Sequence, residues 1–489
     1  MARWLLRKDA SVRAADNRTV PPCLEALSRM LPGSGIFTGG FAPEAFAGID
    51  LIAISPGVPL GERLVQQAAR QGVPVVGDME LFAWAIKEQS ETPEGCKRAE
   101  QEQLDTAFPK IIAITGSNGK TTVTAMVGAM VKNAGWDAEV AGNIGPAVLD
   151  ALVRRQDSGK LPQAWILEVS SFQLETTCSL HPDAAAVLNL SEDHLDRYAG
   201  MADYAAAKAR IFSGRAGGGN GASHGIQHGV QHEVQHGAQH GVQILNREDP
   251  GVLEMALPGR KRITFGLGSP AGDSDFGLLR EGENIWLAQG AKRLIKTAEL
   301  RVAGLHNVAN ALAALALCRA AGLPFEPLLQ ALREFRSLPH RMEKVAAFSG
   351  ITFYDDSKGT NVGATVAALN GMGQQVVLIA GGDGKGQDFS PLAEPVAKQA
   401  RAVVLIGCDA EKIATAIARC GIPLHHAATM EEAVRKSFEL ARKGDAVLMS
   451  PACASLDMFR NYAHRAQVFV EAVRQIETGS FANVRGISN

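Results

Sequence analysis

At 489 residues the chain exceeds the roughly 250–300 residues at which one hydrophobic core stops growing, so we expect about three domains. It has 49 Lys and Arg against 51 Asp and Glu, a net charge of -2, which excludes the strongly basic surface of a nucleic-acid-binding protein. The first ten residues lack a signal-peptide apolar stretch and no run of about 20 apolar residues occurs, so neither export nor membrane insertion is expected. The seven cysteines form no CxxC pair, which argues against a disulfide framework or zinc knuckle and favours the cytoplasm.

Short β-branched runs alternate with Ala- and Leu-rich stretches along most of the chain. This alternation is typical of βαβ units, so we predict an α/β fold with mostly parallel sheets. The predicted strands are 49–55, 110–115, 164–169, 184–190, 375–380, 402–407 and 446–450, and the clearest predicted helices are 121–134 and 307–321. A polar stretch at 89–108 and the Ser-Leu-Pro at 337–339 interrupt the pattern and give predicted domains at 1–108, 109–337 and 338–489.

The first predicted domain begins unusually. Residues 2–8 are expected to end a helix, and 11–15 are expected to form a strand that ends at Asp16. In a dinucleotide-binding half-domain this strand would be the second, after a first strand and a glycine-rich turn. Only 15 residues precede Asp16 and none is glycine. We therefore expect either a Rossmann-like domain that lacks its first strand or a sequence that starts downstream of the true start.

A glycine-rich loop directly follows the predicted strand at 110–115 and precedes a predicted helix. It consists of Gly116, Ser117, Asn118, Gly119, Lys120, Thr121 and Thr122. Backbone amides of such a loop bind phosphate oxygens, the lysine neutralises phosphate charge and the first threonine can hold Mg²⁺. The loop departs from GxxxxGK[ST] because Ile114 stands at the first glycine position. The order of strand, loop and helix nevertheless predicts a nucleotide site.

Other side chains that could take part in catalysis also follow predicted strands. Glu168 lies at the end of one strand, and His194 comes shortly after the next. Since ligands bind at the carboxyl ends of parallel strands, we expect both beside the phosphate loop as magnesium ligands. The helical pattern alone would place Lys208 on a helix surface.

Polar loops follow three predicted strands of the third domain, at 354–361, 381–385 and 450–455. Their position predicts a pocket for a small substrate that closes on the nucleotide site. Cys453 lies in the last loop, and without a placed histidine partner it is interpreted as a small buried residue.

A four-residue repeat at 216–243 places histidines at 224, 228, 232, 236 and 240. As a helix it would form an imidazole stripe suited to nickel, copper or zinc. Glycine recurs in most units and disfavours a helix by about 1 kcal/mol each relative to alanine, which favours a low-complexity loop without function.

Ten motifs, in this order along the chain, resemble those of the Mur ligases, and most of all the Mur ligases that add D-glutamate. The resemblance covers essentially the whole chain except the histidine repeat. The motifs are ITGSNGKTT (114–122), GNIG (142–145), LEVSSFQLETT (167–177), NLSEDHLDRY (189–198), AAAKARI (205–211), LHNVANALAAL (305–315), LPHRME (338–343), DDSKGTNVGAT (355–365), GGDGKGQDFSPL (381–392) and SPACASLDMF (450–459).

The resemblance implies a Rossmann-like domain for uridine diphosphate, a central P-loop ATPase domain that carries the histidine-rich insertion, and a C-terminal Rossmann-like domain for the incoming amino acid. It implies an ATP-dependent ligase of cytoplasmic peptidoglycan precursor synthesis. This enzyme would phosphorylate the alanyl carboxylate of UDP-N-acetylmuramoyl-L-alanine and join the acyl phosphate to the amine of D-glutamate. A monomer is expected, with no nucleic-acid partner. Positioning and charge neutralisation carry most of such catalysis, which agrees with the phosphate loop.

The resemblance also implies the site residues, motif by motif. Lys120, Glu168, His194 and Lys208 would be catalytic. Two Mg²⁺ ions are expected, with Thr121, Glu168, His194 and Lys208 as ligands, the last as a carbamate that supplies an anionic oxygen. ATP would contact the phosphate loop together with Asn307, Asn310, Arg341 and Asp356. The substrates would contact Asp16, Asn17, Arg18, Ser55, Gly57, Asn143, Ser170, Gln173, Lys358, Thr360, Lys385, Ser455, Leu456 and Tyr462.

Two departures from the family pattern stand out beside the histidine repeat. Tyr462 occupies a position where phenylalanine is usual, and the missing first strand affects the expected uridine site. Two other functions remain open at this point. The chain could be a ligase of the same fold that adds another amino acid or extends folate with glutamate, or a metal-storage or metal-delivery protein that works through the histidine repeat.

Overall fold

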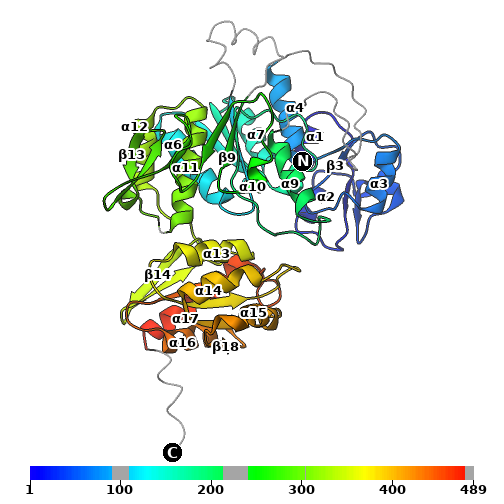
Figure 1. The fold of residues 1–489 in the computed structure, drawn as a ribbon. Helices are drawn as coiled ribbons and strands as arrows, with labels where there is room; N and C mark the ends of the chain where they lie inside the picture. Colours follow the sequence, from blue (N-terminus) through cyan, green and yellow to red (C-terminus); the bar gives the residue numbers. More distant parts are fainter. Residues whose placement is uncertain (91–108, 213–240, 303, 480–489) are drawn as a thin grey trace, which may run out of the picture.

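The computed structural model describes residues 1–90, 109–212, 241–302 and 304–479. Figure 1 shows two lobes, with the N-terminal and middle parts of the chain side by side in one and the C-terminal part in the other. Four β-sheets underlie these lobes in the described ranges. No described helix is both long enough and apolar enough to cross a membrane.

A nine-stranded sheet forms the middle of the molecule, in the order β13-β12-β11-β10-β9-β8-β5-β7-β6. Its strands run parallel from β6 to β11, and β12 and β13 are added antiparallel at one edge. The strands are β5 (Lys110–Thr115), β6 (Ala138–Gly142), β7 (Ala164–Glu168), β8 (Ala184–Val187), β9 (Val242–Asn246), β10 (Arg262–Phe265), β11 (Phe276–Glu281), β12 (Asn284–Gln289) and β13 (Lys292–Lys296).

Helices bury both faces of this sheet. In β5, Ile112 and Ile114 pack into the core on one face, and Ile111 and Ala113 into the core on the other. A strand buried on both faces reads as a continuous apolar run, and this is why β5 could be predicted from sequence. The helices are α6 (Lys120–Asn133), α7 (Val148–Asp157), α8 (Ser171–Leu174), α9 (Met201–Ala209), α10 (Pro250–Leu253), α11 (Leu305–Ala320) and α12 (Phe325–Glu334).

The N-terminal part contains two separate pairs of parallel strands rather than one sheet. β1 (Ala14–Asp16) pairs with β2 (Ile36–Thr38), and β3 (Ile52–Ala53) pairs with β4 (Val75–Val76). No described strand joins the two pairs. The helices are α1 (Ala2–Leu6), α2 (Leu24–Ser28), α3 (Arg63–Arg70) and α4 (Asp78–Ser90), and α4 packs against α7.

The C-terminal lobe contains a six-stranded sheet in the order β14-β15-β19-β16-β17-β18, in which only β14 is antiparallel. Its strands are β14 (Glu343–Phe348), β15 (Ile351–Asp355), β16 (Val376–Gly381), β17 (Ala400–Ile406), β18 (Leu424–His426) and β19 (Ala446–Met449). Two apolar cores lie on its opposite faces. Its helices are α13 (Val362–Gly371), α14 (Ala393–Gln399), α15 (Ala410–Ile417), α16 (Met430–Leu440) and α17 (Tyr462–Glu477).

The predicted α/β fold with mostly parallel sheets and several domains is confirmed. Several predicted strand ranges were too long, most clearly those of β1, which covers 14–16, β3, which covers 52–53, and β8, which ends at Val187. The antiparallel β12 and β13 were not predicted. β13 is the edge strand and carries exposed charged residues, and the neighbouring β12 begins and ends with polar residues, so both lack the long apolar run of the central strands.

Candidate functional site

The phosphate loop connects β5, a central strand of the sheet, to α6, as the sequence predicts. Gly119 is the N-cap of α6 with φ of 83°, and its backbone passes close to the Asn310 side chain. The Lys120 ammonium curls back to donate to the carbonyls of Gly116 and Ser117, at 2.8 and 2.9 Å. Burial lowers the pKa of Lys120, and Glu168 and Asp193 oppose this shift. The loop therefore presents a cation and a helix N-terminus at one point, which suits phosphate.

Glu168 ends β7 beside the loop, and its side chain is 2% exposed. Its Oε1 accepts a hydrogen bond of 2.6 Å from Asn143, which follows the neighbouring strand β6. Its Oε2 is buried and makes no hydrogen bond within the described residues. The structure thus brings together Glu168 and Asn143, two predicted site residues. The second oxygen of Glu168 contacts neither solvent nor a hydrogen-bond donor, as expected for an oxygen that binds a cation.

His194 lies beyond β8 in a left-handed backbone conformation, with φ of 57°. Its ring packs on Phe172 at 4.6 Å between centroids, and Nε2 is 3.6 Å from an oxygen of Asp193. Burial lowers the pKa of His194, while Asp193 opposes the shift. The neutral imidazole that results is the form that binds metal ions.

Lys208 lies on α9 and is only 1% exposed, so the helical pattern that placed it on a surface was wrong. Its Nζ donates to the carbonyl of Gly116 at 2.9 Å and lies 4.3 Å from the Tyr204 ring centroid. Burial, followed by repulsion from Lys120, lowers the pKa of Lys208 well below its ordinary value. Two lysines therefore converge on one carbonyl of the phosphate loop, and the buried one favours its neutral amine.

The predicted ATP residues outside the loop lie close to it. Asn307 and Asn310 lie on the first turns of α11, where the Asn310 amide donates to Asn307 at 3.2 Å. Arg341 comes from the C-terminal lobe and donates to Thr121 Oγ1 at 3.0 Å. Asp356 accepts from Ser450 Oγ at 2.7 Å, and burial raises the pKa of Asp356 to about 7.

The predicted amino-acid residues lie on loops at the carboxyl edge of the C-terminal sheet. Lys358 Nζ is 5.2 Å from the Tyr462 ring centroid. The loops that carry Lys385 and Ser455 are joined by a bridge between Asp383 and Ala454. Thr360 donates its backbone N–H to the carbonyl of Lys358, and Leu456 is 72% exposed. The three polar loops predicted from sequence therefore meet.

The predicted uridine-diphosphate residues come from two different strand pairs. Asp16 and Arg18 bond to each other at the end of β1, and Arg18 lowers the pKa of Asp16 to about 2, while Asn17 between them is exposed. Ser55 and Gly57 belong to a turn after β3, in the other strand pair. Arg197 donates to the carbonyl of Pro56 in this turn at 2.8 Å, and so ties it to the middle of the molecule.

Ser170 and Gln173 make a local structural contribution. They form a capping box at the start of α8, in which Ser170 Oγ accepts from the Gln173 backbone. The Gln173 amide also donates to Asp78 of α4 at 2.9 Å. These bonds fix α8 to the N-terminal part of the chain.

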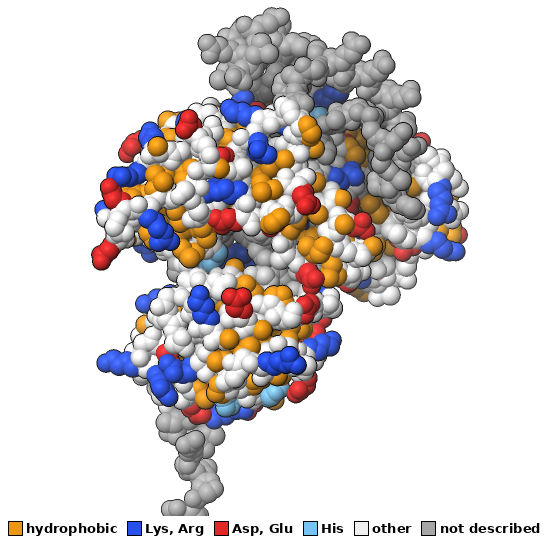
Figure 2. All heavy atoms as spheres, viewed as in Figure 1, with side chains coloured by type: hydrophobic (Ala, Val, Ile, Leu, Met, Phe, Trp, Pro, Cys, Tyr) orange, Lys and Arg blue, Asp and Glu red, His pale blue; other side chains and the backbone are white. Residues whose placement is uncertain are grey.

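Sequence reasoning missed the polar link between the lobes. The Asn361 amide donates to Asn118 Oδ1 at 3.1 Å and to Asp193 Oδ2 at 3.2 Å. Figure 2 shows the surface hollowed where the two lobes face each other. The only sequence signal for this link was the polar character of the two loops, which does not identify partners far apart in sequence.

The histidine repeat lies outside the described residues except for its last three positions, of which Val242 and Gln243 belong to β9. Most of the predicted linker at 89–108, including Cys96, also lies outside them. Cys453 is fully buried, as interpreted from sequence.

Comparisons with known proteins give a consistent result. Family models described as "Mur ligase MurD-like, N-terminal domain", "Mur ligase middle domain" and "Mur ligase, glutamate ligase domain" match residues 1–77, 114–221 and 340–453. The chain is 64% identical to the UDP-N-acetylmuramoylalanine–D-glutamate ligase of Nitrosospira multiformis, over 99% of this chain and 96% of that protein. It is 60% identical to the ligase of the same name from Nitrosomonas europaea, over 98% and 94%.

Solved structures agree on the fold. The UDP-N-acetylmuramate-alanine ligase of Thermotoga maritima superimposes with a TM-score of 0.56, over 97% of this chain and 96% of that chain, at 18% identity. At this identity the likeness concerns the fold alone.

Proposed function

Since this chain belongs to the Mur ligase family, we propose that it is an ATP-dependent ligase that joins D-glutamate to UDP-N-acetylmuramoyl-L-alanine. The observation that carries the proposal is the convergence of Lys120, Glu168 and Lys208 on the phosphate loop, in a chain 64% identical to a ligase of that name. The same identity favours this substrate over those of other ligases with the same fold. The reaction belongs to peptidoglycan precursor synthesis.

The chemistry needs a carboxylate to be activated before an amine can attack it. Transfer of the ATP γ-phosphoryl group to the alanyl carboxylate would give an acyl phosphate, with ADP leaving. Lys120 and the amides of the loop would hold the phosphates, and Arg341, which already reaches Thr121, would bring positive charge from the other lobe. Asn143, fixed on Glu168, would orient the carboxylate that is activated. Such catalysis rests on positioning and electrostatic stabilisation.

The donor set fits divalent magnesium. The unpartnered Glu168 Oε2, the Thr121 hydroxyl and the His194 imidazole would hold two Mg²⁺ ions, which supply charge neutralisation for phosphate oxygens. Lys208 fits a carbamate, because carbon dioxide reacts with a neutral amine and burial favours that form. The carbamate would give the site an anionic oxygen that an ammonium cannot offer.

The amino acid would bind at the three loops of the C-terminal lobe. Lys358 and Lys385 would pair with the two carboxylates of D-glutamate, and Thr360, Ser455, Leu456 and Tyr462 would complete the pocket. We also propose that the divisions at 108 and 337 separate the uridine, ATP and amino-acid units. The enzyme is proposed to act in the cytoplasm as a monomer, without nucleic acid.

Substrate choice is tested by ATP-dependent phosphate release from the full chain with UDP-N-acetylmuramoyl-L-alanine and a panel of amino acids. Turnover is expected with D-glutamate and not with L-glutamate. Turnover with L-glutamate alone, or with a folate acceptor in place of the uridine nucleotide, would overturn the assignment. Nickel affinity without any ligase activity would favour the metal-storage alternative.

The carbamate is tested with Lys208→Ala, assayed with and without bicarbonate and a short aliphatic acid. Activity should be lost and partly restored by the acid, which supplies the missing carboxylate. A signal from ¹³C-labelled bicarbonate on the wild-type protein, absent from the variant, gives a readout independent of activity. Full activity of the variant at every bicarbonate concentration would refute the carbamate.

A further inference from the structure

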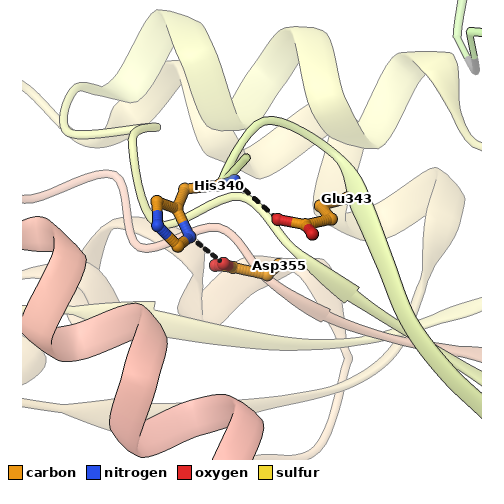
Figure 3. A group of neighbouring side chains, drawn as sticks. All are labelled: His340, Glu343 and Asp355. Carbon is orange, nitrogen blue, oxygen red and sulfur yellow. Dashed lines mark hydrogen bonds and ion pairs between the residues drawn. The ribbon is translucent and has the colours of Figure 1, made fainter. Parts of the chain in front are cut away.

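His340 and Asp355 form a hydrogen-bonded dyad that none of the proposed roles uses. Figure 3 shows the ring of His340 directed at Asp355, with Nδ1 2.7 Å from Asp355 Oδ2 and the other ring nitrogen facing away from it. Asp355 is fully buried, whereas the His340 side chain is 29% exposed. Since a carboxylate only accepts hydrogen bonds, Nδ1 carries the proton of this bond, and Nε2 is the ring nitrogen that can accept another proton.

The surroundings hold this dyad in one orientation. Asp355 Oδ1 accepts from the backbone and hydroxyl of Ser357, at 2.9 and 2.5 Å. Glu343 accepts from the backbone N–H of His340 at 2.9 Å. His340 itself has φ of 63°, a left-handed conformation that costs about 1–3 kcal/mol for a residue other than glycine. The chain thus sustains backbone strain to present this imidazole.

His340, Glu343 and Asp355 lie within 4.8 Å of one another, which is close enough for a metal centre. However, both oxygens of Asp355 and one oxygen of Glu343 already accept hydrogen bonds. A metal would have to replace these bonds. The arrangement is that of an imidazole oriented by a carboxylate, with the second ring nitrogen left to act.

The dyad lies between the two halves of the proposed reaction. The next residue, Arg341, bonds to Thr121 of the phosphate loop. On the other side, the His340 carbonyl accepts from the backbone of Lys358, and its ring is 6.2 Å from that of Tyr462. The activated carboxylate and the amino acid are assigned to these two sides, so the imidazole lies where amine and acyl phosphate would meet.

We propose that His340 is the general base that removes a proton from the D-glutamate ammonium. This inference rests on the proposed function. The ammonium N–H bond breaks, its proton passes to Nε2, and the freed lone pair forms the C–N bond. The C–O bond to phosphate breaks and its electron pair leaves with the phosphate, which takes the second amine proton. Asp355 stabilises the imidazolium through Nδ1.

The charged groups around His340 come from several elements. Asp355 of β15 and Glu343 of β14 are acidic, Arg341 and Lys358 are basic, and Tyr462 of α17 adds a phenol. These groups surround the segment that carries His340, so the pH profile is compared among variants that leave them in place.

The test separates amine deprotonation from carboxylate activation. Hydroxylamine is largely unprotonated at neutral pH and captures an acyl phosphate as a hydroxamate without needing a base. His340→Gln should lower kcat with D-glutamate by about 10²–10⁴-fold and leave hydroxamate formation near the wild-type rate. Its deficit with D-glutamate should shrink as the pH approaches the pKa of the free amine.

Asp355→Asn provides a second variant. The asparagine amide would donate to Nδ1 and force the proton onto Nε2, while its oxygen still accepts from Ser357. It should match His340→Gln, and the double variant should be no worse. Glu477→Gln, at an exposed position at the end of α17, is the control and should keep wild-type rates in both assays. Thermal melts confirm that each variant folds.

Equal loss of glutamate and hydroxylamine turnover in His340→Gln would overturn the base assignment, as would a deficit independent of pH. A wild-type enzyme that forms no hydroxamate with UDP-N-acetylmuramoyl-L-alanine would instead refute the proposed function. The two failures are therefore distinguishable.

Discussion

At the scale of single residues, burial changes the protonation of side chains such as that of Asp356, a residue type that is ordinarily an ionised carboxylate at neutral pH. Asp356 is 7% exposed, and burial raises its pKa to about 7, against the opposing influence of Ser450 and Arg341. The folded chain therefore binds this proton more tightly than the unfolded chain. Its contribution to stability is complete below the ordinary carboxyl pKa and is lost as the pH rises through about 7.

Asp356→Asn removes this titration. Between pH 5 and pH 8 we expect the wild-type free energy of unfolding to fall by about 3 kcal/mol more than that of the variant, because the slope of about 1.4 kcal/mol per pH unit acts from pH 5 to about 7. Denaturant unfolding at several pH values measures it. Asp273→Asn, at an exposed aspartate, is the control and should retain the wild-type slope. Parallel curves for wild type and Asp356→Asn would contradict the expected role of burial.

Residue type and motif position were enough to predict the phosphate loop, Glu168 and His194 as parts of the site. They did not predict the burial of Lys208 or the dyad of His340 and Asp355. The dyad joins side chains 15 positions apart through a left-handed turn, and no periodicity signals such a contact. The bond from Gln173 to Asp78 likewise depends on where α4 packs, whereas the capping box that Gln173 forms with Ser170 is local in sequence.

At the scale of secondary-structure elements, the junction of β5 and α6 depends on close approach to α11. A Cβ added at Gly119 would lie 2.6 Å from Asn310 Oδ1. Gly135, just after α6, has the same φ of 83° and open space around it. At either position, the left-handed backbone would cost a residue other than glycine about 1–2 kcal/mol. Only at Gly119 would its Cβ also collide with a neighbouring side chain.

Gly119→Ala and Gly135→Ala form a matched pair. Both should lose about 1–2 kcal/mol of stability. Only Gly119→Ala should also weaken ATP binding, by at least about tenfold, because displacement of Asn310 and the loop costs more than about 1.4 kcal/mol. Titration calorimetry with an ATP analogue and thermal melts measure the two effects. Equal ATP affinity of both variants would show that the loop tolerates the contact.

Elements buried on both faces were predictable, and edge elements were not. β5, β7, β16 and β17 are apolar along nearly their whole length, so the sequence alone indicates them. β12, β13 and β14 are only partly buried and contain polar or charged residues, and their antiparallel pairing depends on turns and neighbours.

At the scale of the whole molecule, Asn361 joins the lobes while it also caps α13. Its side-chain oxygen accepts from Ala364, and its amide donates to Asn118 and Asp193 of the other lobe. Asn361→Asp keeps a cap acceptor, removes both donors and places a negative charge beside Asp193.

We expect Asn361→Asp to lower the rate of ATP-dependent phosphate release by at least about tenfold, since loss of a charge-linked contact costs about 1.5–3 kcal/mol. Its melting temperature should stay close to that of the wild type. Asn133→Asp removes an amide donor to Pro327, away from the lobe interface, and should leave the rate unchanged. A large fall in melting temperature without a change in rate would mean that the contact only supports folding.

The division of the N-terminal part into two strand pairs implies an uneven resistance to opening. Two-stranded sheets are marginal by themselves, whereas the nine-stranded sheet is held by cores on both faces. Amide hydrogens of β1 to β4 should therefore exchange with solvent far sooner than those of β5 and β7. A uridine nucleotide bound there would have to order this region, and part of its binding free energy would be spent on doing so. The affinity for the nucleotide would then depend on the rigidity of the two strand pairs as much as on the contacts between nucleotide and protein.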